Sequence, residues 1–138
     1  IGLYGGLPFA DATPVVSLSL PIIQTRDVLA GESVGYGNTW IAERDSRIVT
    51  VSCGYADGIL RVMGPKTHFF ANGTAVPVAG RISMDSICID VTDVSDLPSA
   101  LELLGPQQSI ETLAQNAGTI GYEILTSLGA RYSRRYVG

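Results

Sequence analysis

The chain has 138 residues, of which 46% are hydrophobic and 16% are charged, a composition typical of one folded domain and not of a disordered chain. Acidic residues outnumber basic ones by 13 to 9, the formal net charge is −4, and Lys66 is the only lysine. This balance argues against binding to nucleic acid or to an anionic membrane surface, because both require a basic face. No apolar run approaches the roughly 20 residues that a membrane-spanning helix needs.

The first third of the chain predicts a linker, a strand and a loop. Residues 1–13 are rich in glycine and small residues and resemble a linker or the end of another domain. Residues 14–22 alternate between apolar and other residues, which predicts a strand, and Pro21 within it predicts a sheet edge or a bulge. Residues 27–38 contain three glycines, which favour a shaped loop over a helix.

Three further β segments are predicted in the middle of the chain. Residues 48–53 read as a strand that runs into a turn at 54–58. Asn72-Gly73 predicts a tight type I′ turn inside a hairpin over 69–76. Residues 81–91 also read as a strand, but the apolar positions change from even to odd numbers near Asp85-Ser86, which predicts a β-bulge.

Helical patterns occur only near the end. Ser109 can cap a helix that buries Ile110, Leu113, Ala114 and Ala117, and Thr119 can cap a second one that ends at Gly129. Residues 131–137 could form a last strand. The fold class that follows is mainly β: a closed or nearly closed antiparallel β barrel with one or two short C-terminal helices.

The histidine and cysteine content of the sequence gives little indication of a metal site or a reactive thiol. His68 is the only histidine and has no Cys or His at ligand spacing, so no metal site is predicted. Cys53 and Cys88 both fall in strand-like runs and are predicted to be buried free thiols rather than a disulfide framework.

Three tyrosines occur on sharply shaped backbone: Tyr36 between two glycines, Tyr55 after Gly54, and Tyr122 at the start of a helix. Such tyrosines often bury the ring and hydrogen-bond the hydroxyl locally. The alternative is catalysis, which requires a nearby cation or hydrogen-bond donor because the free phenol has a pKa of about 10.

Several motifs follow one another along the whole chain: residues 1–5, Ile-Gly-Leu-Tyr-Gly; 33–37, Ser-Val-Gly-Tyr-Gly; 54–58, Gly-Tyr-Ala-Asp-Gly; 80–85, Gly-Arg-Ile-Ser-Met-Asp; and 118–123, Gly-Thr-Ile-Gly-Tyr-Glu. In this order they resemble the C-terminal domain of alanine racemase, a pyridoxal-phosphate enzyme. The resemblance implies that residues 1–13 are the end of a preceding barrel domain and that 14–138 form the β-barrel domain.

The resemblance also implies roles for individual residues. Tyr36 is expected to be the catalytic base on the face of the L-enantiomer, and Met84 to offer its backbone amide to the substrate carboxylate. Tyr55 is expected to contact the substrate, and Tyr122 and the backbone of Ile1 the cofactor phosphate. The entrance to the site is expected to be lined by Arg61, Arg81 and Ile120. Without the resemblance, the two arginines read as solvated ion pairs at strand ends.

The cofactor implied is pyridoxal 5′-phosphate, held by a lysine outside this chain because Lys66 falls in a turn that looks exposed. The implied partners are alanine, an N-terminal α/β barrel domain and a second subunit of a homodimer. The intact enzyme is expected to be cytoplasmic and to make D-alanine for peptidoglycan precursors, by proton transfer between two bases. The chain by itself is expected to fold but to be inactive.

Two other interpretations remain open. An amino-acid decarboxylase of the same fold type would use a cysteine of its β domain near the cofactor, but neither Cys53 nor Cys88 lies in a matching loop. A non-catalytic β-barrel binding module would not depend on the hydroxyl of Tyr36.

Overall fold

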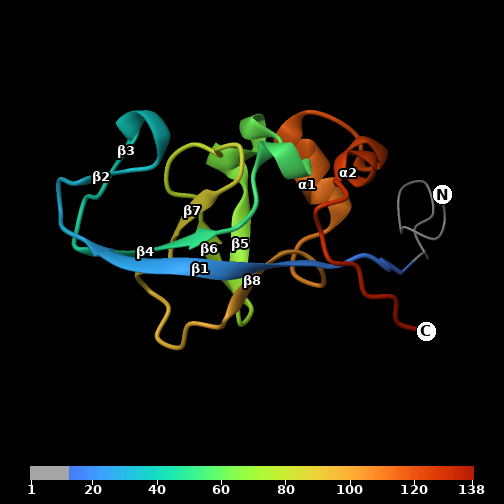
Figure 1. The fold of residues 1–138 in the computed structure, drawn as a ribbon, viewed down its shortest axis with the longest axis horizontal. Helices are drawn as coiled ribbons and strands as arrows, with labels where there is room; N and C mark the ends of the chain where they lie inside the picture. The colour runs from blue at the N-terminus through green and yellow to red at the C-terminus, as the bar shows by residue number, and fades with distance from the viewer. Residues whose placement is uncertain (1–12) are drawn as a thin grey trace.

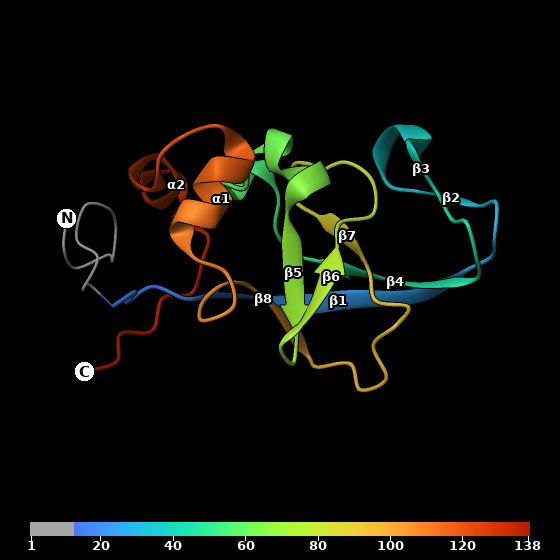
Figure 2. The same ribbon diagram turned by 180° about the vertical axis from the view of Figure 1, so that it is seen from behind.

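The computed structural model describes residues 13–138, and the predicted linker at 1–13 lies almost wholly outside them (Figures 1 and 2). Short 3-10 helices, labelled η, interrupt the β structure. The elements are β1 (Leu18–Val28), β2 (Ser33–Val34), η2 (Tyr36–Asn38), β3 (Trp40–Ile41), β4 (Ser46–Val51), η3 (Tyr55–Asp57), η4 (Arg61–Lys66), β5 (His68–Ala71), β6 (Thr74–Pro77), β7 (Ile87–Asp90), β8 (Ala100–Leu104), α1 (Ile110–Ala117) and α2 (Gly121–Ser127).

Six strands form one antiparallel sheet in the order β6-β5-β8-β1-β4-β7. The two outer strands approach each other, since Val78 after β6 bridges to Ile89 in β7 and the Ala79 N–H donates to the Cys88 carbonyl at 2.8 Å. The sheet is therefore a nearly closed barrel, and the predicted fold class is confirmed. The β2–β3 ribbon stands apart as a separate two-stranded sheet.

Strand β1 lies at the centre of the sheet and changes partners along its length. It pairs with β8 over residues 18–21 and with β4 over 22–28, and its register with β4 shifts between Ile22 and Gln24. The prediction of a bulge near Pro21 is confirmed, whereas that of a sheet edge is wrong. Pro21 is tolerated at a central position because it lies where pairing passes from β8 to β4.

The hairpin is confirmed and the strand over 81–91 is not. Asn72 and Gly73 have φ of 48° and 84°, as the type I′ turn between β5 and β6 requires. Only Ile87–Asp90 of the predicted strand is extended, and residues 81–86 form a loop closed by the Ser83 N–H donating to the Ser86 carbonyl at 3.1 Å. The predicted bulge at Asp85-Ser86 is therefore wrong. The change of register is absorbed by a turn that lets Ile82 and Ile87 both reach the core.

The first helix is confirmed in detail and the second is partly corrected. Ser109 caps α1, its hydroxyl accepting from the Thr112 N–H at 3.2 Å, and Gly118 ends the helix in the left-handed region. Helix α2 is capped by Ile120, not Thr119, and Gly129 does not end it in the left-handed region. The Gly129 N–H instead donates to the Asp57 carbonyl at 3.1 Å.

The predicted last strand over 131–137 is wrong, because this segment is irregular. It is held by side chains instead of a sheet ladder: Tyr132 contacts Cys53, and Arg131 pairs with Asp57. The C-terminal segment thus packs on the turn that follows β4.

One continuous core fills the barrel and the base of the helices. It includes Phe69 and Leu101 from the sheet, Met63 from η4, Leu113 from α1 and Ile124 from α2. Within residues 13–138, none of the helices has the length and apolar character needed to cross a bilayer.

Candidate functional site

The elements that carry the predicted site residues lie on the same side of the long strand β1. Figures 1 and 2 both show the β2–β3 ribbon at one end of that side, the short helices η3 and η4 in the middle, and α1 and α2 at the other end. The barrel therefore acts as a platform that presents a row of loops and short helices.

Tyr36 projects from a turn that glycine makes possible. Gly35 and Gly37 have φ of 81° and 77°, and between them the Tyr36 side chain is 73% exposed. A left-handed backbone on both sides costs little only for glycine. The interpretation in which this ring is buried and locally bonded is wrong for Tyr36.

The loop at 80–84 packs closely against the Tyr36 turn. A Cβ on Gly80 would lie 3.0 Å from the Val34 carbonyl oxygen, and a Cβ on Gly37 would lie 3.8 Å from Nη1 of Arg81. The Arg81 guanidinium therefore lies beside the turn that carries Tyr36.

The other edge of the same loop is joined to the turn at 54–58. The Tyr55 N–H donates to the Ser83 carbonyl at 3.0 Å, and the Ala56 N–H donates to the Met84 carbonyl at 3.1 Å. The side chains of Tyr55 and Met84 are 42% and 52% exposed. Within residues 13–138, the Met84 N–H has no hydrogen-bond acceptor. The loop at 80–84 thus connects Tyr36 and Arg81 with Met84 and Tyr55.

An ion-pair network beneath this loop was not predicted. Asp57 is only 3% exposed and accepts from the Gly54 N–H at 3.0 Å. Nε of Arg131 lies 2.8 Å from Oδ1 of Asp57, while Nη1 lies 2.7 Å from Oδ1 of Asp85. The hydrogen bond with Asp85 raises the pKa of the Arg131 guanidinium above its usual range. Asp57 and Arg131 are 74 positions apart, so local sequence patterns gave no signal for the pair.

The remaining predicted residues lie nearer the helices. Ile120 and Tyr122 line an apolar groove of about 220 Å³ between α1 and α2, where Tyr122 is half-buried. Arg61 is exposed at the start of η4, and neither Arg61 nor Arg81 forms an ion pair with any residue of the described range. Ile1 lies outside the described residues.

Both cysteines are free, as predicted. Cys53 is fully buried, and its Sγ lies 3.2 Å from the Tyr132 hydroxyl. Burial raises the pKa of the Cys53 thiol to about 11, so the thiol is neutral at pH 7. Cys88 is half-buried on β7, with Sγ 3.8 Å from Oγ1 of Thr50. Cys53 therefore does not fit a decarboxylase-type role facing a cofactor.

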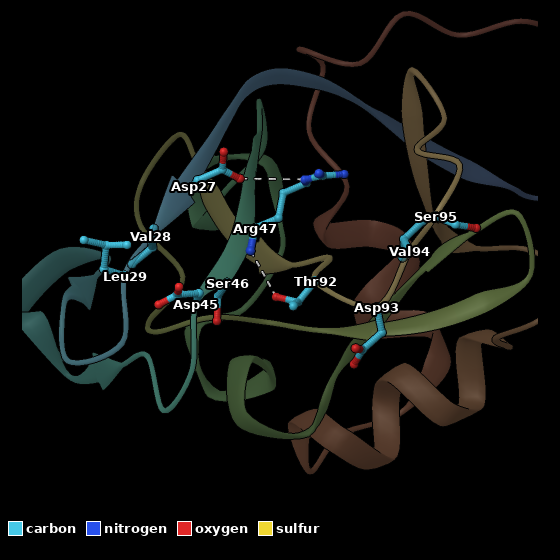
Figure 3. A pocket seen from close by; sticks show the side chains of 10 residues that line it. All are labelled: Asp27, Val28, Leu29, Asp45, Ser46, Arg47, Thr92, Asp93, Val94 and Ser95. Carbon is cyan, nitrogen blue, oxygen red and sulfur yellow. Dashed lines mark hydrogen bonds and ion pairs between the residues drawn. The ribbon is translucent and has the colours of Figure 1, made fainter.

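A separate groove of about 620 Å³ contains none of the predicted residues (Figure 3). It lies between the end of β1, the start of β4 and the loop after β7. The Arg47 N–H donates to Thr92 at 3.0 Å, and the Arg47 side chain pairs loosely with exposed Asp27 at 3.8 Å. Among the described residues no group of His, Cys, Asp and Glu could hold a metal ion.

Comparison with known proteins identifies the family. The model of the family described as "Alanine racemase, C-terminal domain" matches residues 15–136. The chain belongs to this family. The alanine racemase of Dinoroseobacter shibae is 56% identical over the whole chain, and that of a Ruegeria species is 58% identical over 99% of it. In both cases the chain spans about two fifths of the relative's length, since 40% of each relative is matched.

Solved alanine racemases share the fold. The biosynthetic alanine racemase of Pseudomonas aeruginosa matches 99% of this chain and 41% of its own, with a TM-score of 0.89 and 43% identity. The alanine racemase of Bartonella henselae, solved with covalently bound pyridoxal phosphate, matches 91% of this chain and 36% of its own, with a TM-score of 0.88 and 41% identity.

Proposed function

We propose that this chain is the C-terminal domain of a pyridoxal-phosphate-dependent alanine racemase and supplies Tyr36 as one of two bases that move the Cα proton. The observation that carries the proposal is the exposed Tyr36 on its Gly-Tyr-Gly turn, joined through one loop to Arg81, Met84 and Tyr55. Membership of the alanine racemase C-terminal domain family supports it.

The residues of this chain fit part of a cofactor site. The half-buried Tyr122 lines the groove between α1 and α2, and we propose that it contacts the cofactor phosphate in the intact enzyme. The only lysine, Lys66, is exposed at the end of η4, where its carbonyl accepts from Asn116 of α1. We propose that the lysine that holds the cofactor lies outside this chain, in a barrel domain whose end is residues 1–13, and that residues 14–138 are the β-barrel domain.

Racemisation removes the Cα proton from one face of alanine and returns a proton to the other. The cofactor, when bound, withdraws electrons from Cα. Tyr36 takes the proton from L-alanine as the phenolate, and in the reverse direction it gives the proton back as the hydroxyl to form L-alanine. Forming the phenolate requires a cation or donor from the facing domain because a free phenol has a pKa of about 10. The Met84 N–H binds the substrate carboxylate, and Tyr55 narrows the space around it.

The exposed position of Tyr36 also fits a shared site. A side chain that projects from the barrel can reach the cofactor-bearing domain of a second subunit, so we propose a homodimer in which each subunit completes the other's site. Arg61, Arg81 and Ile120, all exposed, would line the route for alanine. The intact enzyme would supply D-alanine for peptidoglycan precursors in the cytoplasm.

The test is the substitution Tyr36→Phe in the intact enzyme, with Tyr136→Phe as the matched control in the exposed C-terminal segment. Loss of a positioned acid–base group costs about 10²–10⁴-fold in rate. Because L- and D-alanine have equal free energies, kcat/KM must fall equally in both directions. The informative readout is therefore the exchange of Cα hydrogen for solvent deuterium.

We expect the Tyr36→Phe enzyme to retain exchange into D-alanine and to lose exchange into L-alanine, while the Tyr136→Phe enzyme behaves as the wild type. Unchanged racemisation by the Tyr36→Phe enzyme would refute the role of Tyr36 and favour a non-catalytic binding module.

A further inference from the structure

We propose that Arg131 is a positioning residue for the substrate-carboxylate site, because it bridges the two turns that hold Met84 and Tyr55. The inference rests on the proposed function and deepens it. The C-terminal segment around Arg131 is neither a strand nor a helix, but its Arg131 guanidinium forms ion pairs with Asp57 and Asp85.

The C-terminal segment that carries Arg131 is anchored to the turn at 54–58. The Gly129 N–H donates to the Asp57 carbonyl at 3.1 Å, and the Tyr132 hydroxyl lies 3.2 Å from Sγ of Cys53. A Cβ on Gly58 would lie 2.0 Å from the Ser127 carbonyl oxygen, so the two backbones touch. The position of Arg131 is therefore fixed from both sides along the chain.

Arg131 bridges two carboxylates. Arg131 reaches the buried Asp57 with Nε at 2.8 Å and Nη2 at 3.3 Å, and it reaches Asp85 with Nη1 at 2.7 Å. Only a guanidinium has donors arranged in a fork that can serve two carboxylates at once in this way.

The bridge formed by Arg131 adjoins the residues proposed to bind the substrate carboxylate. Each carboxylate lies next to a site residue. Asp57 accepts from the N–H of Gly54, the residue directly before Tyr55, and Asp85 is the residue directly after Met84. Arg131 therefore fixes both ends of the contact in which the Ala56 N–H donates to the Met84 carbonyl. The Met84 N–H, which would bind the carboxylate, lies in the same planar peptide unit as the Ser83 carbonyl, which accepts from the Tyr55 N–H at 3.0 Å. Its direction therefore depends on the same pair of turns that Arg131 bridges.

The experiment compares Asp85→Asn and Arg131→Lys in the intact enzyme with Asp93→Asn as a matched control. Asp85 is exposed, so its substitution spares the buried Asp57–Arg131 pair and preserves folding. Asp93 belongs to an exposed Arg–Asp pair outside this network, with Nη2 of Arg44 at 2.6 Å. Steady-state kinetics, thermal unfolding and inhibition by acetate as a simple carboxylate are measured for each variant.

We expect both network variants to raise KM for alanine and the inhibition constant of acetate on the order of tenfold, with kcat and the unfolding midpoint of Asp85→Asn nearly unchanged. The double variant should be no worse than Arg131→Lys alone, because both changes break the same bridge. Wild-type KM and acetate inhibition in both variants, or equal effects in Asp93→Asn, would overturn the inference. Absence of any racemisation by the wild-type enzyme would instead refute the proposed function.

Discussion

The close contact between Gly54 and the loop at 80–84 allows a quantitative prediction. The backbone of Gly54 is extended, with φ of −162°, so any residue could adopt its conformation. Space is the constraint: a Cβ would lie 2.2 Å from the Ser83 carbonyl oxygen and 2.3 Å from that of Met84. Both are backbone atoms, so Gly54→Ala must move one turn away from the other.

The expected loss follows from the contacts that the movement breaks. The hydrogen bonds from the Tyr55 and Ala56 N–H groups to this loop contribute about 1–3 kcal/mol together. Forcing a methyl group into closely packed atoms costs about 1–3 kcal/mol more. Gly54→Ala should therefore lower the free energy of unfolding by about 2–6 kcal/mol.

Urea unfolding followed by circular dichroism measures the loss, and hydrogen exchange of the Tyr55 and Ala56 amides locates it. The control is Gly118→Ala, because a Cβ there meets no atom within 4 Å although φ is +70°. Gly118→Ala should lower the free energy of unfolding by only about 1–2 kcal/mol, the cost of a non-glycine residue in the left-handed region. The Tyr55 and Ala56 amides should stay protected from exchange. Wild-type stability and amide protection in Gly54→Ala would refute the reasoning.

Two further outcomes concern pH and helix capping. Burial raises the pKa of Cys53 to about 11, so the folded chain holds this proton to a higher pH than the unfolded chain does, and the free energy of unfolding should fall by about 2 kcal/mol as the pH rises from 9 to 11. Tyr132, whose pKa is also raised by burial, acts in the same direction. Urea titrations across this range should show a smaller fall for Cys53→Ala, and stability that rises with pH would contradict the assignment. Ser109→Ala should cost about 1 kcal/mol by removing the cap of α1. The same titration should show no loss for the exposed Ser95→Ala, and equal losses in the two variants would argue against the cap.

The sequence predicted those features of the fold that depend on neighbouring residues. Asn72-Gly73 specifies its turn by backbone preference alone, and Ser109 caps the helix that starts at the next residue. The failures involve partners far along the chain. Gly129 follows the end of α2, as predicted, but its N–H meets the Asp57 carbonyl instead of forming a left-handed cap, and the segment after it binds through side chains instead of forming a strand.

The same distinction applies to the site. The glycines around Tyr36 indicated an unusual turn, and the structure confirms the turn and shows the ring exposed. The apolar pattern of 81–91 predicted a strand where the structure has a loop, because Ile82 and Ile87 are both buried although a turn separates them. The pairing of Arg131 with Asp57 and Asp85 depends on the folded path of the whole chain, so no local pattern could have revealed it.

The central place of β1 affects how the domain can be made. Its partners are β4, about 20 residues later, and β8, about 80 residues later, so during synthesis one side of β1 stays unpaired until residues 100–104 have left the ribosome. An early strand that waits for a late partner exposes a template for unwanted pairing between nascent chains. Folding of this domain is therefore expected to be slow, whereas the hairpin β5–β6 can form without waiting for β8 because its strands are adjacent in the chain.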